Sequence, residues 1–149
     1  MSFSSDIQST FISAAVASAT AISTAAAVGN NAALTLTASP YVTDAARKIT
    51  ITCAGDDDAI SFNIVGLDQL GNAATENLAG TDGGVSTSVG YWTSITSITA
   101  VGDPAGNVSA GTSNSVAAPI FGGRLRLKGL YAVNTATAGT ITFRETSPT

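Results

Sequence analysis

The stretch ITCAGDDDAISF at residues 51–62 places the carboxylates of Asp56, Asp57 and Asp58 close to Cys53, the single cysteine of the chain. Carboxylates and thiolates serve as metal ligands and as catalytic groups, so the stretch could form a site. It also lies between two runs of alternating residues, and Gly and Asp are turn-forming residues. A calcium loop needs more oxygen ligands at fixed spacing and a distal Glu. We therefore predict a hairpin turn here, with weak surface binding of a cation as the alternative.

Few other residues could support catalysis. The chain contains no histidine, the commonest general base and metal ligand. Lys48 and Lys128 fall in predicted strands, and no base is evident beside a serine or threonine. Glu76 and Glu145 could act as glycosidase carboxylates only if the fold brought them together. We predict that the protein is not an enzyme and binds no cofactor or metal. With one cysteine no internal disulfide can form, and we predict a buried Cys53.

The segment GRLRLKG at residues 123–129 is the one basic cluster of the chain. In a strand, alternation places Arg124, Arg126 and Lys128 on one face and the two leucines on the other. Two interpretations stay open. The basic face is either an exposed strand face with cross-strand partners such as Glu145, or a docking strip for an acidic surface of a partner subunit.

Composition limits the class of protein. The 149 residues suit a single domain, with 44% hydrophobic and only 11% charged residues. Ser, Thr, Ala and Gly take the place of the missing charged residues. The resulting neutral, hydroxyl-rich surface suits packing against copies of the same chain. A net charge of −4 with 6 basic residues argues against nucleic-acid binding. The apolar stretch at 11–28 is built mainly of Ala, Ser and Thr, so we predict no membrane span. The first basic residue is Arg47, so we predict no secretory signal and expect a soluble protein made in the cytoplasm.

Residues 1–30 differ from the rest of the chain, since they carry a single charge, Asp6, and a run of small residues. Large residues such as Phe11 and Ile22 can share one helical face, which favours a helix over residues 6–20, whereas the β-branched content favours an extended arm. A segment with so few large side chains needs a neighbour to pack on. We therefore expect an N-terminal arm at 1–30, with Phe11 as a candidate partner-binding residue together with the basic strip.

From residue 31 onward the pattern is alternation with Gly-rich punctuation, which indicates strands. In RKITITC the side chains of Ile49, Ile51 and Cys53 are predicted to point inward, and in AISFNIV those of Ile60, Phe62 and Ile64. We predict an all-β fold, an antiparallel β-sandwich of jelly-roll or Ig-like type over residues 31–149. The strands are predicted at 33–37, 47–53, 59–65, 73–79, 85–89, 106–111, 124–133 and 139–144.

The segment YWTSITSITAV at 91–101 does not alternate, because its large residues Trp92, Ile95, Ile98 and Val101 recur every three positions. A period of three fits neither a flat strand nor an α-helix. We predict a short helical turn that leads into a strand at 97–101.

Residues 44–112 carry a longer pattern. A basic pair is followed by ITITCAG, an acidic turn, AISFNIVGLD, a GN turn, a strand with the sequence TEN, and an aromatic pair before TSIT, with GNVSAGT at the end. This order of turns and strands resembles a segment frequent in virion structural proteins of tailed bacteriophages. Cys53 departs from the usual small hydroxyl residue of that pattern.

The resemblance implies a structural role in a phage particle and no catalytic residues. It suggests a capsid decoration (cement) protein located in the virion, a homo-oligomer with a trimer favoured, whose partners are the major capsid protein and copies of itself. The alternatives are a tail, fibre or head–tail joining protein, or a carbohydrate- or surface-binding β-module. In the last case Tyr91 and Trp92 would be the stacking residues, although Trp92 is better explained as a core residue.

Overall fold

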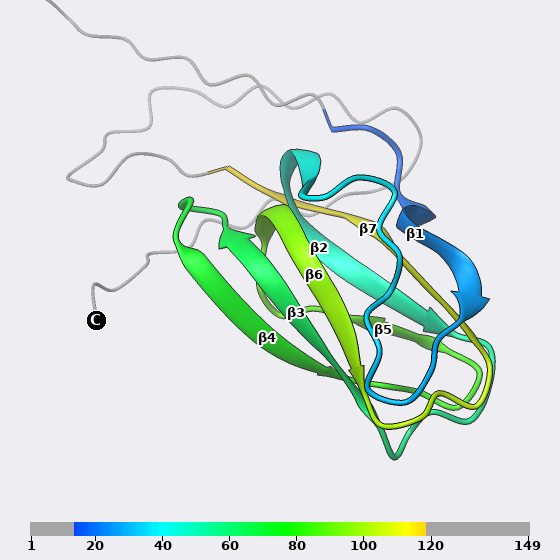
Figure 1. Ribbon diagram of the computed structural model, residues 1–149. Helices are drawn as coiled ribbons and strands as arrows, with labels where there is room; N and C mark the ends of the chain where they lie inside the picture. Colours follow the sequence, from blue (N-terminus) through cyan, green and yellow to red (C-terminus); the bar gives the residue numbers. More distant parts are fainter. Residues whose placement is uncertain (1–13, 119–149) are drawn as a thin grey trace, which may run out of the picture. The chain divides into compact units, whose positions relative to one another are not determined.

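The computed structural model describes residues 14–118, which form a single open antiparallel sheet of seven strands (Figure 1). The strand order is β1-β7-β2-β6-β3-β4, and β5 pairs with β2 beside this path. The predicted all-β, antiparallel class is thereby confirmed. The strands are β1 (Ser18–Ala27), β2 (Tyr41–Cys53), β3 (Ser61–Asp68), β4 (Ala73–Ala79), β5 (Val85–Thr87), β6 (Trp92–Val101) and β7 (Asn107–Ala117).

The core follows from alternation along the strands. Ile49 and Ile51 in β2 and Phe62 and Ile64 in β3 are fully buried, as predicted from the sequence. Burial of each such side chain contributes roughly 1.5–3 kcal/mol. Residues from both end strands of the path, β1 and β4, belong to the same core cluster, so the sheet must curl around it. The cluster contains Ile22, Leu34, Ile49, Ile51, Cys53, Phe62, Ile64, Leu78, Trp92, Ile95, Ile98, Ala100, Val108 and Ala110.

The helical turn predicted for residues 91–97 is wrong, because Trp92–Val101 form one strand. Its period of three arises from the pairing of β6 with β3. The register shifts between Val65↔Ser97 and Gly66↔Ile95, and again before Asp68↔Trp92. Each shift leaves one β6 residue, Thr96 or Thr93, without an opposite residue, which is a β-bulge. Each bulge adds one position to the period of two, so the side chains at 92, 95 and 98 all point inward.

Gly66 in β3 makes the first of these bulges possible. A Cβ atom at position 66 would collide with the carbonyl oxygen of Ser94 in the bulged part of β6. The second bulge is held by hydroxyl groups: Thr93 Oγ1 donates to the carbonyl oxygen of Asp68 at 2.9 Å, and Thr43 Oγ1 donates to that of Trp92 at 2.9 Å. The bulges are therefore built-in features of the sheet.

The predicted hairpin between residues 47–53 and 59–65 is also wrong. A turn does occur at the acidic stretch, but β2 pairs with β5, β6 and β7, whereas β3 pairs with β4 and β6. The connection from β2 to β3 therefore crosses to another part of the curled sheet. Local alternation indicates that a strand exists, but it does not indicate which strand lies beside it.

The N-terminal part of the described chain is extended. The helix favoured for residues 6–20 is wrong at 18–20, which belong to β1, and residues 1–13 lie outside the described residues. β1 pairs with β7, and its Ile22 is fully buried. The division into an arm at 1–30 and a domain from 31 stays a prediction. The strand predicted at 33–37 is reduced to one isolated bridge, Ala33↔Thr99, although Leu34 is buried as its pattern suggested.

Two connecting segments form backbone hydrogen bonds with strands of the sheet. In the β1–β2 connection, the N–H of Leu34 donates to the carbonyl of Ile98 in β6, and the N–H of Thr37 donates to that of Ile22 in β1, both at 2.8 Å. After β5, the N–H of Ser88 donates to the carbonyl of Ile49 in β2 at 2.8 Å. These bonds brace the curl of the sheet.

Candidate functional site

The acidic turn is a structural joint built around Asp57, which is 1% exposed. Its Oδ1 accepts a hydrogen bond from the backbone N–H of Ala105 at 2.7 Å. Its own N–H donates to the carbonyl of Thr81, and its carbonyl accepts from the N–H of Ile60, both at 3.2 Å. Gly80 is required nearby, since a Cβ atom there would collide with the carbonyl oxygen of Asp57. One residue thus joins three connections through its side chain and its backbone, those that follow β2, β4 and β6.

Cys53 lies beside this joint and is 2% exposed, so the predicted burial is confirmed. Removal from water raises the pKa of the Cys53 thiol, and the neighbouring Asp57 carboxylate raises it further. A buried thiol with a raised pKa stays protonated at neutral pH, and the protonated form is a poor nucleophile and a poor metal ligand. The arrangement therefore favours a packing role for Cys53.

The two flanking aspartates, Asp56 and Asp58, are exposed. Asp56 pairs with Asp82 in an isolated antiparallel bridge. The charge of Asp56 raises the pKa of Asp58, with smaller contributions from a hydrogen bond to Asp56 and from Asp82. These carboxylates thus repel one another at neutral pH. Within residues 14–118, no three His, Cys, Asp or Glu side chains are grouped as a bound metal ion would require.

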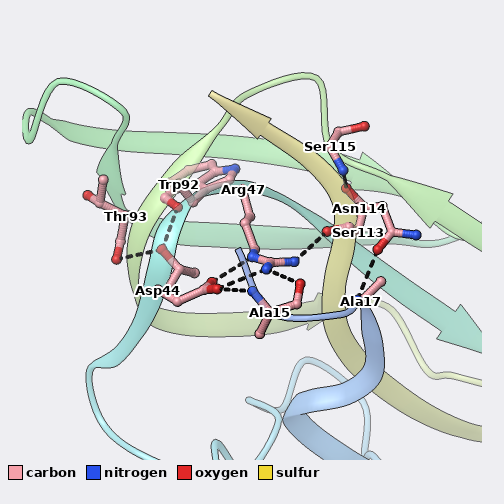
Figure 2. Close-up of polar contacts among 10 residues, drawn as sticks. Ala15, Ala17, Asp44, Arg47, Trp92, Thr93, Ser113, Asn114 and Ser115 are labelled. Atoms are coloured by element: carbon pink, nitrogen blue, oxygen red, sulfur yellow. Dashed lines mark hydrogen bonds and ion pairs between the residues drawn. The ribbon is translucent and has the colours of Figure 1, made fainter. Parts of the chain in front are cut away.

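A second polar cluster centres on Arg47, which is 1% exposed although it is charged (Figure 2). Its Nε lies 2.6 Å from Asp44 Oδ1, and its Nη2 lies 2.9 Å from Asp44 Oδ2. Its Nη1 donates to the carbonyl of Ser113 in β7 at 2.9 Å, and Nη2 also donates to the carbonyl of Ala15. A buried guanidinium needs this number of acceptors, because its donors have lost their water.

The Arg47 cluster fixes the segment that precedes β1. The N–H of Ala15 donates to Asp44 Oδ2 at 2.5 Å, and the N–H of Ala17 donates to Asn114 Oδ1 at 3.0 Å. The hydrogen bond from Arg47 is the main cause that lowers the pKa of Asp44 to about 2. Slight burial of the carboxyl raises this pKa, and the hydrogen bond from the Ala15 N–H lowers it further. We refer to Ala15, Asp44, Arg47 and Ser113 as the Arg47 clamp. It holds residues 15–17 against β2 and β7.

The Arg47 clamp was not predicted from the sequence, although a signal was present. Arg47 has the same parity as Ile49, Ile51 and Cys53, so strand alternation alone places it on the buried face. Asp44 stands three residues earlier and supplies the opposite charge. A basic residue on the inward face of a strand, with an acid close by in sequence, indicates a buried ion pair.

Two further carboxylates bind backbone N–H groups of their own chain. Glu76 accepts from Val89 at 2.6 Å and from Gly90 at 3.0 Å. Asp68 accepts from Leu70 at 2.8 Å and from Asn72 at 2.9 Å. Burial raises the pKa of Asp68, but hydrogen bonds from the backbone N–H groups of Asn72 and Leu70 and from the Asn72 side chain outweigh burial, so that this pKa is lowered. Glu145, considered as a glycosidase partner of Glu76, lies outside the described residues.

The aromatic pair is divided between core and surface. Trp92 is 2% exposed and belongs to the core, as sequence analysis favoured. It offers no face on which a sugar could stack. Tyr91 is half-buried, and Lys48 Nζ lies 5.5 Å from the centre of its ring, within reach of a cation–π interaction.

The predicted partner-binding residues Phe11, Arg124, Arg126 and Lys128 all lie outside residues 14–118, as do the strands predicted at 124–133 and 139–144. The described part of the chain contains no helix of the length and apolar character needed to cross a membrane. In comparisons with known proteins, the chain matches no family model, no curated protein and no solved structure.

Proposed function

We propose that this chain is a structural protein of a phage virion and acts without catalysis. In this proposal it is a capsid decoration protein that stabilises the head through contacts between subunits. The proposal begins with the resemblance of residues 44–112 to phage virion proteins, a range that runs from β2 into β7. In this proposal the chain is synthesised in the host cytoplasm and is then incorporated into the virion.

The observation that carries the proposal is the use of charged side chains as internal joints. The carboxylates of Asp57, Asp68 and Glu76 each bind backbone N–H groups of their own chain, and Arg47 binds two backbone carbonyl groups. Such bonds fix loops and strands relative to one another, and a protein that must present one rigid surface to a shell needs this property.

The partners in this proposal are the major capsid protein and further copies of the chain, in a homo-oligomer for which a trimer is favoured. Low charge and many small residues support it, because neutral surfaces pack together with little loss of ionic hydration. The proposal includes no nucleic acid and no membrane as a partner.

For the fold, we propose an antiparallel β-sandwich that accounts for the curl of the sheet. Support comes from β2, which pairs with β6 near its start and with β5 near its end, so it can belong to both layers. Further support comes from the β1–β2 connection, which binds β6 and β1 by backbone hydrogen bonds. A jelly-roll or Ig-like strand order remains the hypothesis for the complete domain.

The test is the location and copy number of the chain in purified virions of the phage that encodes it. We expect quantitative mass spectrometry to find hundreds of copies per particle, and cryo-electron microscopy to place them on the outer surface of the head. Heads stripped of the protein should regain it on incubation with purified chain. A dozen copies or fewer would instead indicate a connector or fibre protein, and absence from the particle would refute a virion role.

A further inference from the structure

The β4 strand ends the sheet with a regular edge. It pairs with β3 from Ser61↔Ala79 to Leu67↔Ala73 without a register shift. The N–H of Gly80 donates to the carbonyl of Ile60 at 3.0 Å, and the N–H of Asp68 donates to that of Asn72 at 2.9 Å. Even-numbered residues of β4 therefore direct their backbone groups toward β3. In an antiparallel ladder the odd-numbered residues then direct theirs away from the sheet.

The outward groups belong to Ala73, Thr75 and Asn77, all of which are exposed. Within residues 14–118 no hydrogen bond involves the outward N–H or C=O groups of these three residues. The nearest cover is the Ser86 hydroxyl, which donates to the carbonyl of Ala79 at 2.5 Å and reaches only the last residue of the strand. Figure 1 shows β4 at the outer margin of the strands drawn.

Within residues 14–118, this edge lacks the features that usually keep sheet edges apart. Edges are commonly protected by Lys, by Pro, by a bulge or by a covering loop. Residues 73–79, with the sequence AATENLA, contain neither Lys nor Pro, and their pairing with β3 has no bulge. The one charged side chain, Glu76, is bound by the N–H groups of Val89 and Gly90.

The strand at the other end of the path, β1, differs from β4 in that its pairing is irregular and its outer side is partly covered. Its pairing with β7 contains two register shifts. The N–H and the hydroxyl of Thr37 bind the carbonyl oxygens of Ile22 and Ala21, both at 2.8 Å, so the outer side of β1 is partly covered. The β4 edge therefore has no equally open β1 edge to join. The remaining end strand, β5, pairs only with β2 and is three residues long. Among residues 14–118, β4 therefore has the longest regular open edge, and an edge that pairs with its own copy closes as a two-fold dimer instead of extending as a filament.

We propose that the β4 edge binds the β4 edge of a second copy of this chain, in antiparallel pairing about a two-fold axis at Thr75. The outward N–H and C=O groups of residues 73, 75 and 77 all find partners in one register. In that register Thr75 faces the partner's Thr75, and Ala73 faces the partner's Asn77. Glu76 then lies opposite the partner's Ala74, so the two carboxylates do not oppose each other. Small side chains on the outer face allow the backbones to approach, and a Thr–Thr cross-strand pair is favourable.

Charge predicts how this contact responds to salt. The basic residues of the described part, Arg47 and Lys48, are outnumbered by its acidic residues, so two copies repel each other at long range. Salt screens this repulsion, and the association should strengthen as salt is raised to about 0.5 M. An edge of this length buries less than the roughly 1,200 Å² of a stable interface. The contact is therefore weak between free molecules and strong where other contacts hold many copies close together. The inference does not depend on the proposed function.

A disulfide test reads the register directly. In the proposed pairing, Thr75→Cys places two thiols on directly opposite residues, whose Cα atoms are about 5.5 Å apart and within disulfide range. Asn77→Cys is the matched control, because its two copies are offset by four residues, or roughly 13 Å. Mild oxidation of concentrated protein in high salt should crosslink Thr75→Cys at least about tenfold faster than Asn77→Cys. A mixture of Ala73→Cys and Asn77→Cys should crosslink into the mixed dimer. The native Cys53 is buried and should contribute little.

A second measurement removes the backbone donor itself. Thr75→Pro lacks the outward N–H, and Pro is tolerated in an edge strand where this group faces solvent. Thr75→Val keeps the N–H and is the matched control. We expect sedimentation equilibrium to show a concentration-dependent rise in mass for wild type and Thr75→Val, and half the limiting mass for Thr75→Pro. Equal crosslinking of the two cysteine variants, or equal mass for Thr75→Pro and wild type, would overturn the proposal.

Discussion

Arg47 and Asp44, three residues apart at the start of β2, form a two-point ion pair with N–O distances of 2.6 and 2.9 Å, and the same pair binds both backbone groups of Ala15. Arg47 is almost fully buried, whereas the Asp44 side chain is 36% exposed. The pair thus lies at the boundary between core and solvent. From there it links the segment preceding β1 to the body of the sheet.

Replacement of Arg47 tests this link. Arg47→Met keeps much of the buried volume but leaves Asp44 and the carbonyls of Ala15 and Ser113 without a donor. We expect the free energy of unfolding to fall by about 2–3 kcal/mol, below the range for a fully buried pair because Asp44 is partly hydrated. Urea denaturation measures this loss, and hydrogen exchange should accelerate at the Ala15 and Ala17 amides. Lys48→Met, at the next position, is the control and should lower stability by no more than about 1 kcal/mol, the value of its cation–π contact with Tyr91.

The pH dependence of stability follows from the lowered pKa of Asp44. This carboxyl titrates at about 2 in the folded chain and at 3.8 in the reference state. Because the pKa of Asp44 is lower in the folded chain than in the unfolded chain, its charged form stabilises the fold at every pH above the unfolded pKa. This stabilisation is lost as pH falls from about 4 toward 2. Asp44→Asn should therefore lower stability at pH 7 and flatten the acid limb of the stability curve. Equal slopes for wild type and Asp44→Asn would contradict the assignment.

The three aspartates of the acidic turn should respond differently to substitution. Asp57→Ala removes the acceptor for the Ala105 N–H and leaves that donor unpaired, at a cost of about 1–3 kcal/mol. Asp56→Ala alters an exposed side chain and should change stability by less than about 0.5 kcal/mol. Thermal unfolding of both variants makes the comparison. A similar, small effect at both positions would show that the turn needs no buried carboxylate.

Cys53 should react only when the protein unfolds. Its thiol is buried, and burial together with Asp57 raises its pKa. We expect Ellman's reagent to label the native protein at least about a hundredfold more slowly than the urea-unfolded protein, because the thiolate is both scarce and covered. Asp57→Asn removes a charge that disfavours the thiolate, but it should not speed labelling greatly while the core stays closed. Rapid labelling of the native wild type would place Cys53 at the surface.

Local pattern predicted much of the secondary structure. The strand expected at 73–79 has those bounds, and the strands expected at 47–53, 59–65 and 106–111 overlap β2, β3 and β7. The segments at 47–53 and 59–65 carry alternating apolar residues, so a period of two identifies them. The strand expected at 97–101 lies within β6, whereas residues 92–96 were misread as a helical turn because two bulges alter the period, and bulges depend on the partner strand. Pairing of β2 with β7 and of β3 with β6 links distant segments, which local periodicity cannot reveal.

The candidate site was predicted only in part. The acidic turn and the burial of Cys53 followed from turn chemistry and alternation. The joint at Asp57 did not, since its partner Ala105 is remote in sequence and bonds through its backbone. Arg47 was predictable in principle from its parity with Ile49. The acceptors that make its burial possible come from Ser113 and Ala15, and only the folded chain brings these together.

The pairing of β1 with β7 also sets the order of events as the chain leaves the ribosome. The ladder partners of β1 run from Ser18↔Thr112 to Ala27↔Asn107, at opposite ends of the described chain. Among the described strands, β1 is synthesised first and must therefore wait, without its β7 partner, until β7 has emerged. Closing so long a loop is slow, because its entropy is lost before the ladder forms. A newly made chain thus carries an exposed strand of small, weakly hydrophobic residues, and that composition limits its tendency to aggregate during the delay.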